Sequence, residues 1–325
     1  MRVSRVKVKE GIYHCMSRVV AGEMRLGERE KEVFRKQMWS VAAFCGVEIL
    51  TYCVMTNHFH VLVKVPVSRE LCDGELLRRC HLLYTNDNLH LSFIEKTLEK
   101  GGVNADVLRE RLHERMCDVS MFMKELKQRF SVWYNKSHDR YGVFWADRFK
   151  SVLVEGEHFA METVAAYIDL NPVRAGLVKD PKDYRFSGYG EACANRTDAK
   201  AGVMEILGER DWYSALNAYR LVLFGKGGQS KALDKQSVDS RKVDAVLSGK
   251  AKFTRLELLR CRCRYFTDGL IIGSKAFVED YYNKNFQHLS ESRPSGSRKM
   301  RGVEMDELMV FRDLRKTVIS LSECD

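Results

Sequence analysis

The chain has 325 residues, of which 45% are hydrophobic and only four are proline, which excludes a disordered or fibrous protein and predicts two or three folded cores. Its net charge of +10 favours a polyanionic partner, with nucleic acid ahead of a membrane surface. No apolar run reaches the roughly eighteen residues that span a bilayer, and the start MRVSRVKVKEGIYH has no apolar signal-peptide core. We therefore expect a cytoplasmic, nucleoid-associated protein. Ten cysteines without a C-x-x-C pair indicate buried thiols rather than a zinc site or a disulfide framework.

The first 65 residues predict a strand, a helix and two further strands. Residues 11–20 alternate in the manner of a strand, and residues 28–45 carry apolar side chains at helical spacing. The stretch VEILTYCVMTNHFHVLVKV, residues 47–65, reads as two apolar strands joined by a short polar turn. Charged residues 66–118 then interrupt this pattern, which predicts one or two surface helices inserted between core elements.

Core elements resume after the insertion. Residues 119–134 show a second amphipathic helix, residues 143–155 a strand or strand pair, and residues 157–170 a helix. Asn171-Pro172 should end that last helix, because a proline disfavours helical geometry in the residue before it.

The order strand, helix, strand, strand, helix, strand predicts an α+β fold: a ferredoxin-like antiparallel sheet with its helices on one face and the other face free for a site. We expect this domain to occupy residues 1–190. Residues 191–240 should form a helical connector, in which the polar and small residues 195–202 indicate a linker. Residues 241–325 should form a basic, mainly helical domain with a mobile loop at 290–302. A turn containing Gly269 and Gly273 between two of its helices makes it similar to a helix-turn-helix DNA-binding module. A small helical bundle without a DNA role is the alternative for this last part.

Two groups of side chains stand out as candidates for chemistry. His58 and His60 share one face of their strand, and two imidazoles so placed can chelate one divalent ion. The structural alternative is one hydrogen-bonded core histidine and one at a strand edge. Thr163, Tyr167 and Asn171 fall four residues apart on one side of the helix. For Tyr167 the alternative is a core tyrosine with a satisfied hydroxyl.

Arg148 and Lys150 lie two residues apart in the strand predicted at 143–155, so they should share a face. That face could contact phosphate groups. An ordinary exposed strand face is the alternative.

Four short motifs resemble those of a known family. His58-Phe59-His60 resembles the His-hydrophobic-His signature of the single-tyrosine HUH transposases, and YIDLNPVRAGLV at 167–178 resembles the tyrosine helix of the REP-associated tyrosine transposases in that superfamily. YHCMSR at 13–18 and GVFWADRFK at 142–150 support the match. The resemblance covers residues 10–190 in the family's order. It implies an insertion-sequence transposase that cleaves and rejoins single-stranded hairpin DNA through a 5′-phosphotyrosine intermediate.

The resemblance also implies roles for particular residues. Tyr167 would be the nucleophile, and His58 and His60 would bind a magnesium or manganese ion, with Asn171 as a third ligand. Candidates for phosphate contacts are Arg18, Arg148 and Lys150. The rival nucleophile is Tyr134 on the other long helix.

Two other functions compete with strand transfer. The first is a domesticated DNA-binding regulator that keeps the fold but does not cut. The second is a metal-dependent phosphoesterase for small molecules, although the two-histidine type carries paired His-x-Thr/Ser motifs that this chain lacks. The sequence leaves open whether the chain acts as a monomer or a homodimer.

Overall fold

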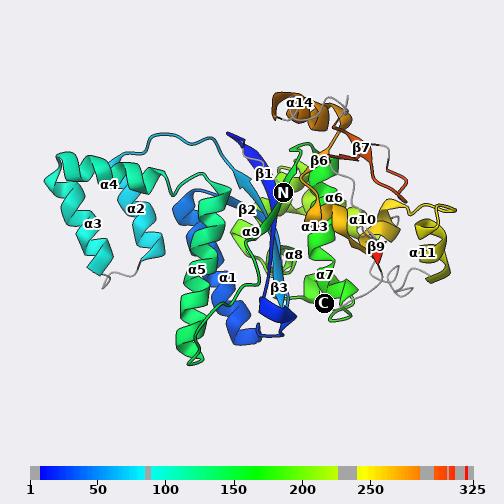
Figure 1. Ribbon diagram of the computed structural model, residues 1–325, viewed down its shortest axis with the longest axis horizontal. Helices are drawn as coiled ribbons and strands as arrows, with labels where there is room; N and C mark the ends of the chain where they lie inside the picture. Colours follow the sequence, from blue (N-terminus) through cyan, green and yellow to red (C-terminus); the bar gives the residue numbers. More distant parts are fainter. Residues whose placement is uncertain are drawn as a thin grey trace.

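A mixed seven-stranded sheet runs through the middle of the molecule, in the order β2-β3-β1-β4-β6-β8-β7 (Figure 1). The computed structural model describes residues 8–84, 89–225, 240–285, 296–305, 307–311 and 319–320. Neighbouring strands of the sheet are antiparallel, except for the parallel pair β4 and β6. In chain order its strands are β1 Gly11–Arg18, β2 Glu48–Val54, β3 His58–Val65, β4 Lys150–Val154, β6 Ile271–Gly273, β7 Arg298–Lys299 and β8 Met309–Val310.

Most of the elements predicted before residue 175 are present. Helix α1, Glu28–Cys45, has the predicted bounds, and α5, Val119–Ser137, begins after Asp118, whose side chain caps its first turn. Helix α6, His158–Asp169, is followed directly by the short helix α7, Asn171–Arg174. The strand predicted at 143–155 is confined to β4, because residues 143–149 form only an isolated bridge to the end of β1.

The prediction that the helices cover one face of the sheet is wrong. Phe59 of β3 packs against Phe34 of α1, with 4.5 Å between ring centroids. The next residue, His60, points to the opposite face and meets Tyr167 of α6 at 6.1 Å. Figure 1 accordingly places α1 and α5 on one side of the sheet and α6 on the other. The reason is that β3 is buried on both faces along most of its length, so both faces need cover.

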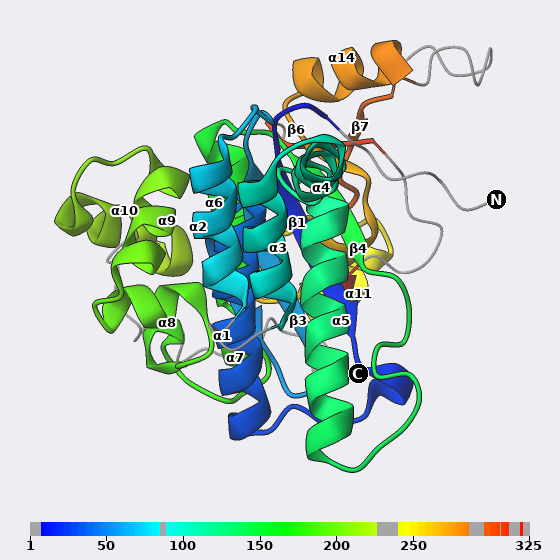
Figure 2. The ribbon, with the colours of Figure 1, turned by 90° about the vertical axis from the view of Figure 1, so that its left-hand side faces the viewer.

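The first part of residues 191–240 is not the predicted connector, because its helices pack in the core. Helices α8, Gly188–Cys193, α9, Thr197–Leu207, and α10, Trp212–Phe224, are grouped on one side of the molecule (Figure 2). Helix α9 packs closely on β2: a Cβ atom added at Gly202 would lie 2.3 Å from the carbonyl oxygen of Leu50. The small residues that suggested a linker therefore permit close helix–strand contact.

The helix-turn-helix interpretation of the C-terminal region is also wrong. Its helices are α11 Ser240–Leu247, α12 Arg255–Leu259, α13 Arg264–Asp268 and α14 Lys275–Asn285. The stretch between α13 and α14, predicted as a glycine turn, contains strand β6, which pairs with β4 and extends the main sheet. A second pairing joins β5, Arg262–Cys263, to β9, Ile319–Ser320. Of the loop predicted at 290–302, residues 290–295 lie outside the described residues and 298–299 form β7.

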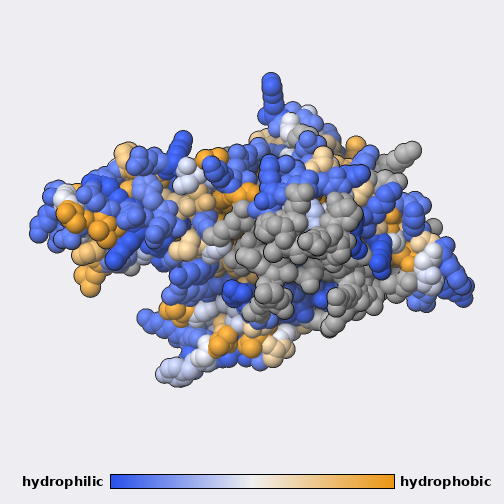
Figure 3. All heavy atoms as spheres, turned by 45° about the horizontal axis from the view of Figure 1, so that its top comes forward, coloured by the Kyte–Doolittle hydropathy of each residue, from blue (hydrophilic) through white to orange (hydrophobic). Residues whose placement is uncertain are grey.

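The insertion after β3 is helical, as predicted, and projects from the sheet as an arm (Figures 1 and 2). It contains α2 Asp73–Leu83, α3 Leu89–Lys100 and α4 Val103–His113. Figure 3 shows apolar side chains at the end of this arm, where Phe93, Val103 and Val107 are exposed. The described residues also contain the 3-10 helices η1 Val20–Gly22 and η2 Pro181–Asp183. No helix in the described ranges is long and apolar enough to cross a membrane.

A fully buried carboxyl group in α6 links this helix to three other elements, β2, α8 and α10. Asp169, the last residue of α6, accepts hydrogen bonds from the hydroxyls of Thr51 and Tyr219 and from the N–H of Tyr189. Burial raises the pKa of Asp169 from 3.8 to about 7, although the three donors lower it.

This raised pKa has a measurable effect on stability. Between pH 4 and pH 7 the unfolded chain loses the proton of Asp169 while the folded chain keeps it, so this group destabilises the fold as pH rises. Asp169→Asn removes this ionisable group. We therefore expect the unfolding free energy of the variant, relative to that of the wild type, to rise by about 4 kcal/mol between pH 4 and pH 7. Urea unfolding at several pH values measures the difference. A difference that stays constant with pH would contradict the assignment.

Candidate active site

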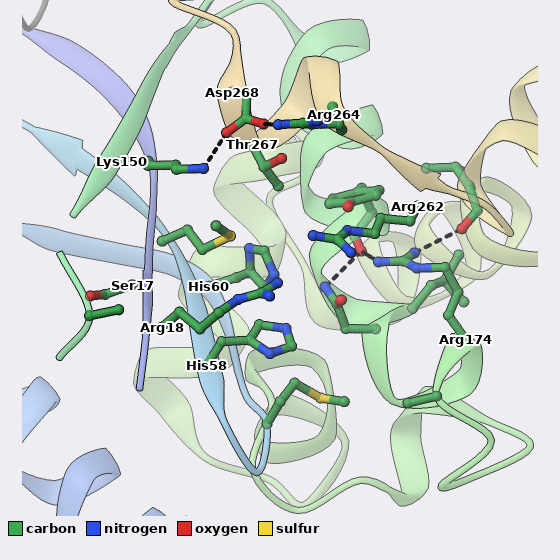
Figure 4. Close-up of a pocket in the computed structure, with 18 of the residues that line it drawn as sticks. Ser17, Arg18, His58, His60, Lys150, Arg174, Arg262, Arg264, Thr267 and Asp268 are labelled. Atoms are coloured by element: carbon green, nitrogen blue, oxygen red, sulfur yellow. Dashed lines mark hydrogen bonds and ion pairs between the residues drawn. The ribbon is translucent and has the colours of Figure 1, made fainter. Parts of the chain in front are cut away.

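The side chains predicted to carry chemistry surround one cavity of about 360 Å³. It lies between the adjoining ends of β1 and β3, helices α6 and α7, and the segment 259–268. In Figure 4, His58, His60 and Arg18 lie on one side of this cavity, and Arg174 and Arg262 lie on the opposite side. All seven predicted site residues line it: Arg18, His58, His60, Arg148, Lys150, Tyr167 and Asn171.

The two histidines are held as neutral imidazoles. Their ring centroids are 5.1 Å apart. Burial and the nearby guanidinium of Arg18 lower the pKa of His58 to about 3, and burial lowers the pKa of His60 well below 6.5. A neutral imidazole is the form that binds a cation. Asn57 Oδ1 lies 2.6 Å from His58 Nδ1, and His14 Nε2 lies 2.9 Å from His60 Nδ1, so Nε2 is the nitrogen left for a cation on each ring.

Asn171 can supply the oxygen ligand that such a site needs. Its Nδ2 donates to the carbonyl oxygens of Tyr167 and Ile168, at 3.2 and 3.0 Å, which leaves the acceptor oxygen for another group. Within the described residues, no group of three histidine, cysteine or carboxylate side chains has the arrangement of a metal site. The three predicted ligands thus offer two imidazole nitrogens and one amide oxygen, and this donor set fits a divalent transition ion such as manganese.

Tyr167 lies between a cation and an aromatic ring. Its own ring is 4.2 Å from the guanidinium carbon of Arg174 and 4.7 Å from the ring centroid of Phe266. Tyr167 is only 2% exposed, and this burial raises its pKa, while Arg174 lowers it. Arg174 is fixed by donating to the carbonyl oxygens of Tyr167 and Leu259. Arg174 was not among the predicted site residues, although it lies in the YIDLNPVRAGLV motif that pointed to Tyr167.

Positive charge dominates the cavity wall. Seven of its lining residues are arginine or lysine and two are aspartate. Lys150 and Arg264 both pair with Asp268, whereas Arg148 is exposed and has no ion pair among the described residues. Because β4 begins at Lys150, Arg148 and Lys150 do not share a strand face, contrary to prediction. Sequence reasoning missed the contribution of the C-terminal region, Arg260, Arg262 and Arg264, whose alternation in LRCRCRYF was the available signal.

The rival nucleophile lies elsewhere. Tyr134 of α5 is 6% exposed and packs against Phe144 and His138, with ring centroids 4.4 and 4.1 Å away. It does not line the cavity, whereas Tyr167 is the one tyrosine among the described residues that does.

Comparison with known proteins adds little beyond this geometry. No protein-family model matches the chain, and no curated protein matches it. A solved structure that aligns with it is that of a REP-associated tyrosine transposase bound to a REP hairpin, at 17% sequence identity and a TM-score of 0.38. The alignment covers 60% of this chain and 86% of that one. A similarity of this size does not assign a function to the chain.

Proposed function

We propose that the chain is a metal-dependent transposase that cleaves and rejoins single-stranded hairpin DNA with Tyr167 as its nucleophile. One observation carries the proposal: the histidine pair of β3 and the Tyr167 and Asn171 side chains, which come from a distant part of the sequence, line one strongly cationic cavity. The strand order β2-β3-β1-β4, with α1 and α5 as the connecting helices, supports the ferredoxin-like arrangement that the sequence predicts for such an enzyme.

Each residue then has a part in the reaction. His58, His60 and Asn171 would hold a magnesium or manganese ion, which would polarise the phosphodiester and neutralise its developing charge. The phenolic oxygen of Tyr167 bonds to phosphorus as the phenol loses its proton and the 3′ oxygen of the DNA leaves as a hydroxyl. Arg174 stabilises the phenolate. Attack by a 3′ hydroxyl on the 5′-phosphotyrosine reverses these steps, so rejoining needs no ATP.

A second function is favoured by one observation. Tyr167 is almost fully buried, with a backbone hydrogen bond from Cys263, which suits a DNA-binding regulator that no longer cuts. A cleavage assay separates the two. Labelled single-stranded hairpins from the DNA flanking the gene are incubated with protein and Mn²⁺ or Mg²⁺, and we expect cleavage with a covalent protein–DNA product. Binding without cleavage under every metal condition would favour the regulator.

The cationic wall makes a further prediction about affinity. Arg148→Ala should weaken binding of a single-stranded oligonucleotide about fivefold, roughly 1 kcal/mol, because it removes an exposed phosphate contact. The slope of log K against log salt should become shallower by about 0.7. Fluorescence anisotropy at several salt concentrations measures both. Arg111→Ala, an exposed arginine on the arm outside the cavity, is the matched control and should change neither. Equal effects of the two variants would contradict a role for the cavity.

A further inference from the structure

A buried chain of hydrogen bonds runs from the C-terminal region to one of the candidate metal ligands. The carbonyl oxygen of Phe266 lies 2.7 Å from Nδ1 of His14, and Nε2 of His14 lies 2.9 Å from Nδ1 of His60. His14 and His60 are each 2% exposed, and their rings are stacked with centroids 5.0 Å apart. His60 lines the cavity and His14 does not, so His14 lies behind the ligand.

The protons in this series of hydrogen bonds can be placed by elimination. A carbonyl oxygen only accepts hydrogen bonds, so the proton between Phe266 and His14 is on His14 Nδ1. Burial disfavours a second proton on His14, so its Nε2 is an acceptor. The hydrogen bond between the two rings then requires the proton to be on His60 Nδ1. In a neutral His60 this leaves Nε2 with a free lone pair, which is the state a metal ligand needs.

We propose that His14 is a positioning residue: held by the carbonyl of Phe266, it fixes His60 in the tautomer whose Nε2 can bind a cation. The proposal rests on the metal-binding function proposed above for His60. It assigns a role to the C-terminal region as well, because the carbonyl that orients His14 belongs to α13. The other histidine has a similar support, since Asn57 accepts from His58 Nδ1 while its own Nδ2 donates to the carbonyl of Gly22.

The first test needs no metal and no substrate. Long-range proton–nitrogen NMR spectra of the metal-free protein, with ¹⁵N-labelled histidine, distinguish the two tautomers of each ring. His60→Gln and His14→Gln spectra assign the two residues. We expect His60 to carry its proton on Nδ1. A wild-type His60 that carries its proton on Nε2, or exchanges freely between the two tautomers, would overturn the proposal whatever the variants do.

The second test compares two substitutions of His14. His14→Phe keeps an aromatic ring but has neither donor nor acceptor, so His60 should lose its single tautomer and the Mn²⁺ affinity should fall about 10- to 100-fold. His14→Gln retains an N–H donor for Phe266 and an acceptor for His60, so the affinity should recover to within a few-fold of wild type. Electron paramagnetic resonance of free Mn²⁺ measures the affinity. His90→Phe, at a histidine that does not line the cavity, is the control and should leave it unchanged.

The outcomes separate this proposal from the proposed function. A fixed Nδ1–H tautomer in His60 together with no Mn²⁺ binding by the wild type would contradict the proposed metal site. The same result would still support the positioning role of His14. Mn²⁺ binding that is equally strong in wild type and His14→Phe would leave the metal site standing and overturn the role of His14. A merely structural role for His14 would lower the stability of both variants without the recovery in His14→Gln.

Discussion

Tyr167→Phe should abolish cleavage and the covalent protein–DNA product, lowering the single-turnover rate by at least about 10⁴-fold, because it removes the phenolic oxygen that we propose as the nucleophile. The ring keeps its contacts with Arg174 and Phe266, so the fold should lose only about 1 kcal/mol from the missing hydroxyl. Single-turnover cleavage of a labelled hairpin and thermal unfolding measure the two effects. Tyr134→Phe is the matched control, at a buried tyrosine outside the cavity, and should cleave at the wild-type rate. Normal cleavage by Tyr167→Phe would refute the assignment.

The second large effect is expected at the histidine pair. His58→Ala should lower the cleavage rate about 10²- to 10³-fold or more and weaken Mn²⁺ binding, while single-strand binding persists through the cationic wall. Truncation of His58 removes the partner of Asn57 Oδ1 in a partly buried hydrogen bond. Truncation of His60 removes the partner of His14 Nε2 in a fully buried one, at a cost of about 1 to 3 kcal/mol in unfolding free energy, so His58 is the position with the smaller expected effect on the fold.

Cleavage assays, calorimetric Mn²⁺ titration and oligonucleotide binding together test this prediction. His81→Ala replaces an exposed histidine on the arm and should change none of the three measurements. If the double variant His58→Ala/His60→Ala still cleaved at the wild-type rate, the metal assignment would be wrong.

Local patterns in the sequence were sufficient for the elements that surround the cavity. Helix α1 follows from apolar side chains at helical spacing, and β2 and β3 follow from an apolar run broken by a polar turn. Local patterns did not predict that helices pack on both faces of the sheet. It depends on α6, which packs against a strand face that already carries His60 and Leu62, and a continuous apolar strand does not reveal which helix will cover it.

Residues of the candidate site could be predicted where short motifs contain them, but not where distant segments meet. His58, His60, Tyr167 and Asn171 were predicted from spacing and family resemblance, and all four line the cavity. The hydrogen bond between His14 and His60 depends on the register of β1 against β3. This register places Met16 opposite His60, and His14 opposite Leu62 on the same face. Sequence alone does not fix this register.

The C-terminal contribution was missed for a related reason. The stretch 269–273, which has a glycine at each end, was predicted as a turn, but Ile271–Gly273 form strand β6 beside β4, which brings α13 against β1 and the cavity. Truncation after about residue 195 would remove Arg262, the carbonyl of Phe266 and helix α10. It should therefore disrupt the folded core and the cavity as well as weaken DNA binding.

The most direct test of the proposed function is to locate the covalent bond that Tyr167 is expected to form with DNA. A hairpin substrate that loses its leaving strand after cleavage traps the adduct, and mass spectrometry of the digested product identifies the modified peptide. We expect a single modified residue, Tyr167, when Mn²⁺ is present. An adduct on Tyr134, or no adduct with either metal on any hairpin from the flanking DNA, would contradict the claim.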